Sequence, residues 1–118
     1  MPASGAQGSG PLPCRRRGSS IKAHAREKRK AGVWAWVDNA GFEGAADFAQ
    51  QIESLGYSAL WVPEAVGCDP FVTLALLAQR TTTLKLATGI ANIYARDAMA
   101  MQSVRKTLDG LSGGRLIL

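Results

Sequence analysis

Short apolar runs alternate with longer amphipathic or strongly apolar segments from about residue 31 to the end of the chain. Each run is too short for a helix and ends in polar residues or glycine, which is typical of a buried parallel strand. The runs predict strands at Val33–Val37, Ala59–Val62, Leu84–Ile90 and Arg115–Leu118, the last of which we expect to be cut short. The segments between them predict helices at Gly41–Leu55, Phe71–Gln79 and 97–112.

Capping residues support these helices. Asp69-Pro70 places an N-cap side chain before a proline that suits the first helical turn. Asp97 and Asn39 are N-cap candidates for the other two helices, and Gly56 suits the position just after a helix end.

The alternation of strands and helices predicts a parallel sheet with helical crossovers. The strand-to-helix connections are longer than the helix-to-strand ones and carry most of the polar residues, and active sites of α/β folds lie on that side. No phosphate-binding glycine motif follows the first strand, where the sequence reads Val37-Asp38-Asn39-Ala40-Gly41. Because a TIM (β/α)8 barrel takes roughly 250 residues, we expect a partial TIM barrel of three to four βα units.

Charge separates residues 1–30 from the remainder. The chain carries a net charge of +5, but residues 14–30 hold eight basic residues and one acidic residue, so the rest carries −2. Residues 1–30 are poor in apolar side chains, and we expect them to form a disordered basic tail. We favour a solvated extension over a basic arm for nucleic acid, and an organellar transit peptide is a further alternative.

The cysteines and the histidine limit which metal sites, disulfides and catalytic bases the chain can form. Cys14 and Cys68 form neither a metal-binding spacing nor a disulfide framework, which fits a reducing, cytoplasmic setting. The single histidine is His24, so residues 31–118 hold no histidine for metal binding or general-base catalysis, and we expect no metal site. No apolar run is long enough to span a bilayer.

Four segments together resemble the N-terminal half of the luciferase-like monooxygenase superfamily, and in particular its F420-dependent oxidoreductases. They are Gly32-Val33-Trp34, ESLGYSALWVPEAVGCDPF from Glu53 to Phe71, LATGIANIYARDAMAM from Leu86 to Met101, and LSGGRLIL at the end. The resemblance covers residues 31–118 and none of residues 1–30. It implies a TIM barrel that binds coenzyme F420 or, alternatively, FMN.

The resemblance also implies a cofactor site. In this family the cofactor ring lies at the carboxyl-end mouth of the barrel, where a non-prolyl cis peptide after the third strand supports it. The matching bond here is Gly89–Ile90, so both residues are candidates for cofactor contact. Gly89 has no Cβ, which lets the backbone approach a flat ring. The alternative is that Gly89 ends a strand where a helix packs closely.

Glu64 ends the second predicted strand and is the candidate catalytic residue. F420-dependent members often carry an Asp-His pair at the positions that match Pro63-Glu64, so this chain departs from that pattern. Glu64 can act as a proton donor or orient substrate. Equally, it can pair with an arginine or with backbone amides as part of the structure.

Five further residues near the predicted mouth complete the set of candidates. Asn92 and Trp36 are candidates for cofactor contact, and Tyr94 and Asp38 for substrate contact. Asp38 is equally a helix-capping candidate. We expect Arg96 to be structural and to pair with a nearby carboxylate.

These inferences predict an oxidoreductase that transfers hydride between F420 and a small organic substrate, with an FMN-dependent monooxygenase as the alternative. The superfamily's phosphate-binding residues come largely from later strands, so we expect this chain to be inactive alone. An inactive truncated remnant and a basic-tail binding module are the non-enzymatic alternatives. We expect no membrane or nucleic-acid partner, and a homodimer is left open for a longer form.

Overall fold

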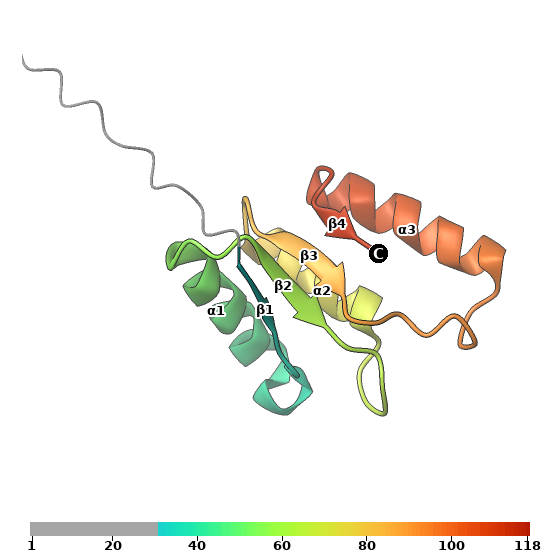
Figure 1. Cartoon of the computed structure of the whole chain (residues 1–118), viewed down its shortest axis with the longest axis horizontal. Coiled ribbons are helices and arrows are strands. Elements are labelled where there is room, and N and C mark those ends of the chain that lie inside the picture. Colours follow the sequence, from blue (N-terminus) through green and yellow to red (C-terminus); the bar gives the residue numbers. More distant parts are fainter. Residues whose placement is uncertain (1–30) are drawn as a thin grey trace, which may run out of the picture.

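The computed structural model describes residues 31–118, so the predicted tail at 1–30, with Cys14 and His24, lies outside the described residues. Each of the first three strands is followed by a helix that leads to the next strand (Figure 1). The elements are β1 (Gly32–Trp34), the 3-10 helix η1 (Asp38–Ala40), α1 (Gly41–Ser54), β2 (Ala59–Val62), α2 (Pro70–Arg80), β3 (Lys85–Thr88), α3 (Ala98–Ser112) and β4 (Leu116–Ile117). The strands form one parallel sheet in the order β1-β2-β3-β4, as predicted.

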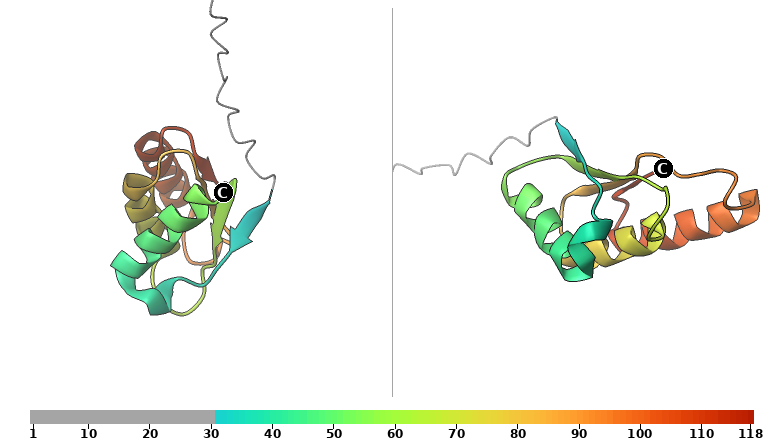
Figure 2. Two further views of the ribbon diagram at one scale, coloured as in Figure 1. Left: turned by 90° about the vertical axis from the view of Figure 1, so that its left-hand side faces the viewer. Right: turned by 90° about the horizontal axis from the view of Figure 1, so that it is seen from below.

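The three α-helices cover one face of the sheet (Figure 2). Strand side chains alternate between faces, so Leu60 and Leu86, which are register partners, pack into the buried core beneath the helices. Their neighbours Trp61 and Ala87 are also register partners and lie on the opposite face, together with Trp34. We call this second face, which no helix of residues 31–118 covers, the open face.

Two of the three predicted N-caps are confirmed. The Asp69 carboxylate accepts hydrogen bonds from backbone amides at the start of α2, and Asp97 accepts one from the Ala100 amide in α3. The Asn39 prediction was wrong, because Asn39 lies inside η1 and α1 begins without a side-chain cap. Gly56 follows the end of α1 with φ at 85°, a conformation that glycine adopts without steric cost.

Three strands are shorter than predicted, and β4 lacks one predicted residue at each end. The first was predicted to reach Val37, but Val37 has helical backbone angles and leads into η1. The third was predicted to reach Ile90, but β3 ends at Thr88. No helix among residues 31–118 is long and apolar enough to cross a membrane.

Candidate functional site

The carboxyl ends of β2 and β3 lie side by side, because Val62 and Thr88 are register partners. Two backbone hydrogen bonds continue this pairing past the strand ends. The Gly89 amide donates to the Val62 carbonyl oxygen at 2.8 Å, and the Glu64 amide donates to the Ile90 carbonyl oxygen at 3.0 Å. The segments that follow the two strands therefore form one continuous edge.

The Gly89–Ile90 peptide bond at this edge is cis, as the resemblance implied. A Cβ atom on Gly89 would lie 3.1 Å from Cδ1 of Trp34 and 3.3 Å from Cβ of Trp61. The close neighbours of Gly89 are thus tryptophans of the open face, and not a helix as in the alternative interpretation.

The Glu64 carboxylate is held by two donors from the loop between β3 and α3. Its Oε2 accepts a hydrogen bond from the Asn92 amide at 2.6 Å, and its Oε1 lies 2.5 Å from Nη1 of Arg96. The side chains of Glu64 and Arg96 are only 11% and 16% exposed. These are the contacts of the structural alternative for Glu64, a pairing with an arginine and a backbone amide.

Arg96 joins two loops. Its Nη2 lies 2.5 Å from Oδ2 of Asp69, the residue that caps α2, and its guanidinium lies 4.7 Å from the centre of the Phe71 ring. Burial opposes the charge, but the hydrogen bonds to Glu64 and Asp69 outweigh it and raise the pKa of Arg96. Burial likewise acts to raise the pKa of Asp69, yet the bonds from Arg96 and backbone amides lower it.

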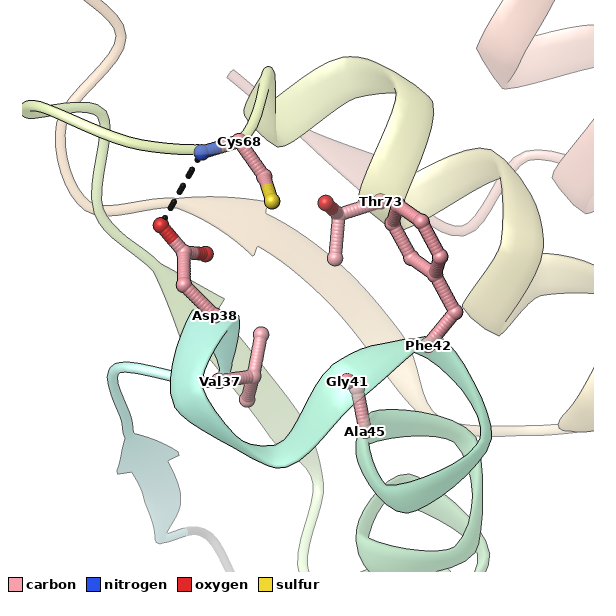
Figure 3. A pocket seen from close by; sticks show the side chains of 7 residues that line it. All are labelled: Val37, Asp38, Gly41, Phe42, Ala45, Cys68 and Thr73. Atoms are coloured by element: carbon pink, nitrogen blue, oxygen red, sulfur yellow. Dashed lines mark hydrogen bonds between the residues drawn. The ribbon is translucent and has the colours of Figure 1, made fainter.

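A small hollow lies beside the end of β1, between α1 and the loop after β2 (Figure 3). Its volume is about 120 Å³, and Val37, Phe42, Cys68 and Thr73 are among its lining residues. The Asp38 carboxylate accepts a hydrogen bond from the Cys68 amide at 3.0 Å at its rim. Asp38, predicted to contact substrate, here ties this loop to η1.

A larger hollow of about 370 Å³ lies at the ends of β2 and β3. Its lining is mainly apolar and consists of Trp61, Thr88, Ile90, Ala91, Ile93, Met101 and Leu118. Pockets for small ligands typically measure about 300–1,000 Å³. The larger hollow falls within this range and the smaller one falls below it.

The structure brings four of the predicted site residues together: Glu64, Gly89, Ile90 and Asn92 all lie at the β2–β3 edge. The Asn92 side chain accepts a hydrogen bond from the amide two residues further on, so it shapes its own loop.

The other three predicted residues lie outside this edge, although the Tyr94 amide contacts the Asn92 side chain. Tyr94 is almost fully exposed, Trp36 lines neither hollow, and Asp38 lies at the smaller one. Trp34, which was not singled out, contacts Gly89. The sequence shows that Trp34 and Trp36 alternate along the first strand. It does not show which partner the Trp34 side chain contacts.

Comparisons with known proteins give matches in both sequence and structure. The family model described as luciferase-like monooxygenase matches residues 16–118. The 5,10-methylenetetrahydromethanopterin reductase of Methanolobus tindarius is 36% identical over 74 residues, which cover 62% of this chain and 23% of the reductase. The chain therefore spans about a quarter of the length of this relative.

Two solved structures share the fold. The coenzyme F420-dependent tetrahydromethanopterin reductase of Methanopyrus kandleri superposes with a TM-score of 0.70 at 28% identity, over 76% of this chain and 26% of the reductase. The monooxygenase RslO1 of Streptomyces bottropensis has a TM-score of 0.63 at 28% identity, over 67% of this chain and 27% of the monooxygenase.

The similarity to the TIM-barrel reductase confirms the predicted α/β fold class, a parallel sheet that corresponds to part of a barrel. The family match covers the β2–β3 edge, the cis Gly89–Ile90 bond and every element of the sheet. The chain belongs to the luciferase-like monooxygenase family.

Proposed function

We propose that this chain forms part of an F420-dependent oxidoreductase, in which the deazaflavin ring lies in the larger hollow against Gly89–Ile90. The observation that carries the proposal is this apolar hollow of about 370 Å³ beside the cis bond, at the carboxyl ends of β2 and β3. Two similar proteins, from Methanolobus and Methanopyrus, are named as reductases of methanopterin derivatives, and the second is named as F420-dependent.

The cofactor would supply hydride transfer with a small organic substrate, and the protein would supply orientation and an apolar surface. Trp61, Ile90 and Met101 line the hollow and would exclude water from one side of the ring. Glu64 would act by orientation, because its carboxylate already binds Arg96 and the Asn92 amide. To donate a proton to substrate, it would first have to leave these partners.

An FMN-dependent monooxygenase is the second candidate. A similar solved structure, RslO1, is named as a monooxygenase, at the same 28% identity as the Methanopyrus reductase. The tricyclic ring of FMN is also flat and largely apolar, so the same hollow would suit it. The choice between the two cofactors therefore rests on direct measurement.

The test is cofactor binding, since the chain spans about a quarter of the length of its relatives. Equilibrium dialysis of the chain with F420 and with FMN should show tighter binding of F420. Replacement of the exposed Ile90 by aspartate should weaken binding about tenfold or more, because it places a charge beside the ring.

Val72→Asp is the matched control. Val72 is also an exposed apolar residue, but it lies on α2 and does not line the larger hollow. It should leave the dissociation constant unchanged. Tighter binding of FMN would favour the second candidate, and equal effects of the two aspartates would remove the hollow from the proposal.

A further inference from the structure

We infer that Trp34 is a positioning residue for the Gly89–Ile90 segment; what that segment binds rests on the proposed function. Trp34 lies on β1, and its indole Nε1–H donates a hydrogen bond to the Gly89 carbonyl oxygen at 2.8 Å. Because the sheet order is β1-β2-β3, this side chain reaches across the whole of β2. The register of the three strands brings Trp34 of β1 and the residues after β3 near one another.

Burial does not account for the position of Trp34. Its side chain is 58% exposed on the open face, whereas a tryptophan placed for core packing would be mostly covered. The indole has a single N–H donor, and that donor is directed at one carbonyl oxygen. The hydrogen bond is therefore the specific interaction that fixes this ring.

Gly89 lies directly against the same ring. A Cβ atom at this position would be 3.1 Å from Cδ1 and 3.2 Å from Nε1 of Trp34, closer than ordinary van der Waals contact. The absence of a side chain at Gly89 thus allows the indole to approach the backbone it binds. The hydrogen bond from Trp34 therefore depends on the absence of a side chain at Gly89.

Trp34 completes a three-point attachment of the segment. The Gly89 amide donates to Val62, and the Ile90 carbonyl oxygen accepts from the Glu64 amide. Both of those bonds come from the backbone of β2 and the residues just after it. Among residues 31–118, Trp34 provides the one side-chain hydrogen bond to Gly89. Without it the Gly89 carbonyl would lose its partner, and the surface offered to a ring would be less fixed.

Two substitutions separate the donor from the bulk of the ring. Trp34→Phe keeps an aromatic ring but removes the donor. Trp34→His keeps a donor, because its five-membered ring superposes on that of the indole with Nε2 in the place of Nε1. If Trp34 acts through its hydrogen bond, Trp34→His should keep the Gly89–Ile90 segment in position and Trp34→Phe should not. If it acts through packing, the order should be reversed.

Amide hydrogen exchange of the chain by NMR tests this directly. In Trp34→Phe, the Gly89 and Glu64 amides should exchange about three- to tenfold faster, the range expected for one lost hydrogen bond. The Leu74 amide, in the buried core on α2, should change less than the Gly89 amide. Trp34→His should match the unmodified chain at all three amides.

Cofactor binding provides the second readout. The dissociation constant for F420 should rise about three- to tenfold in Trp34→Phe and stay within about twofold in Trp34→His. Unchanged exchange at Gly89 in Trp34→Phe, or a uniform increase that includes Leu74, would overturn the inference. If the unmodified chain binds neither F420 nor FMN, the proposed function fails, and the exchange rates still decide whether Trp34 positions the segment.

Discussion

At the scale of single residues, the contact between Glu64 and Arg96 is mostly closed to solvent, whereas the pairs that Arg80 forms with Glu43 and Asp47 are open to it. Removal of one partner from a buried ion pair leaves an uncompensated charge and costs about 3–5 kcal/mol in fully buried cases. Arg96 keeps Asp69 as a second partner, and both side chains retain some exposure. We therefore expect a smaller cost here.

Glu64→Gln should lower the free energy of unfolding by about 1–3 kcal/mol, measured by urea denaturation. The control is Glu43→Gln. Glu43 also contacts an arginine, Arg80, at 3.1 Å, but the two side chains are 79% and 38% exposed. Its loss should cost less than about 1 kcal/mol. Equal costs for the two variants would show that the Glu64 contact is no stronger than a surface pair.

Glu53 makes stability depend on pH. Its carboxylate, on α1, accepts hydrogen bonds from the amides of Thr82, Thr83 and Leu84 just before β3. Burial acts to raise the pKa of Glu53, but these bonds together lower it. A lowered pKa in the folded state adds stability above the unfolded value of about 4.3, and this stability is lost as pH falls through the folded value.

Glu53→Gln should therefore destabilise the chain near neutral pH and make the free energy of unfolding less sensitive to acid. Urea denaturation at several values between about pH 3 and 7 checks this, because the two curves should converge at the acid end. Glu43→Gln is again the control, and near neutral pH it should destabilise the chain less than Glu53→Gln does, because its ion pair is exposed. Parallel curves for Glu53→Gln would contradict the prediction.

At the scale of elements, Arg115 connects three of them. Its guanidinium donates to the carbonyl oxygen of Ala78 in the last turn of α2 at 2.8 Å and to that of Leu84 before β3 at 3.1 Å. It also donates to the carbonyl oxygen of Ser112 at the end of α3. The last carbonyl groups of a helix have no partner within the helix, so Arg115 supplies one for α2.

Arg115→Lys should lower the free energy of unfolding by about 2 kcal/mol, because a lysine ammonium cannot reproduce the planar set of donors. Arg105→Lys is the matched control. Arg105 donates to Gln102 within the same helix, so its replacement should cost less than about 0.5 kcal/mol. Thermal or urea unfolding would show the difference, and similar values would argue against a connecting role for Arg115.

The elements themselves were predictable because their signals are local. Helical spacing, the Asp69-Pro70 start and Gly56 are all visible within one segment of sequence. The strand ends were less predictable, because pairing with a neighbouring strand decides them. Val37 shows this: its apolar side chain suited a strand, but the backbone turns there into η1.

The resemblance identified Gly89–Ile90, and the expected pairing of Arg96 with a carboxylate is confirmed. The bonds of Trp34 to Gly89, of Arg96 to Asp69 and of Arg115 to Ala78 were not predictable one by one, because they join residues that lie 27 to 55 positions apart. Such contacts depend on sheet order and register, which alternation along one strand does not reveal. For the same reason, the sequence left open whether Glu64 pairs with an arginine or acts on substrate.

At the scale of the whole molecule, the helices cover one face of the sheet (Figure 2). Trp34 and Trp61, which are register partners, lie on the open face. Within residues 31–118 the sheet also has two edge strands, β1 and β4. Exposed apolar faces and unpaired edges favour association with another protein surface. The open face is therefore the surface through which we expect the chain to associate.

Sedimentation velocity should show a larger average mass for the 118-residue chain as its concentration rises. Trp34→Ser, which removes a large apolar side chain from the open face, should reduce this association. Val72→Ser removes an exposed apolar side chain on α2 and serves as the control. A concentration-independent monomer, or equal effects of the two variants, would contradict the prediction.

Asp69 has a consequence for loop exchange between family members. One of its carboxylate oxygens caps α2 and the other binds Arg96, so the start of the helix and the loop after β3 share one side chain. A transplanted β2–α2 loop of different length would shift that carboxylate, and would uncap the helix and release the arginine together. The loops after β2 and after β3 should therefore be exchanged as a pair, so that the acidic residue of the first loop and the arginine of the second come from the same protein.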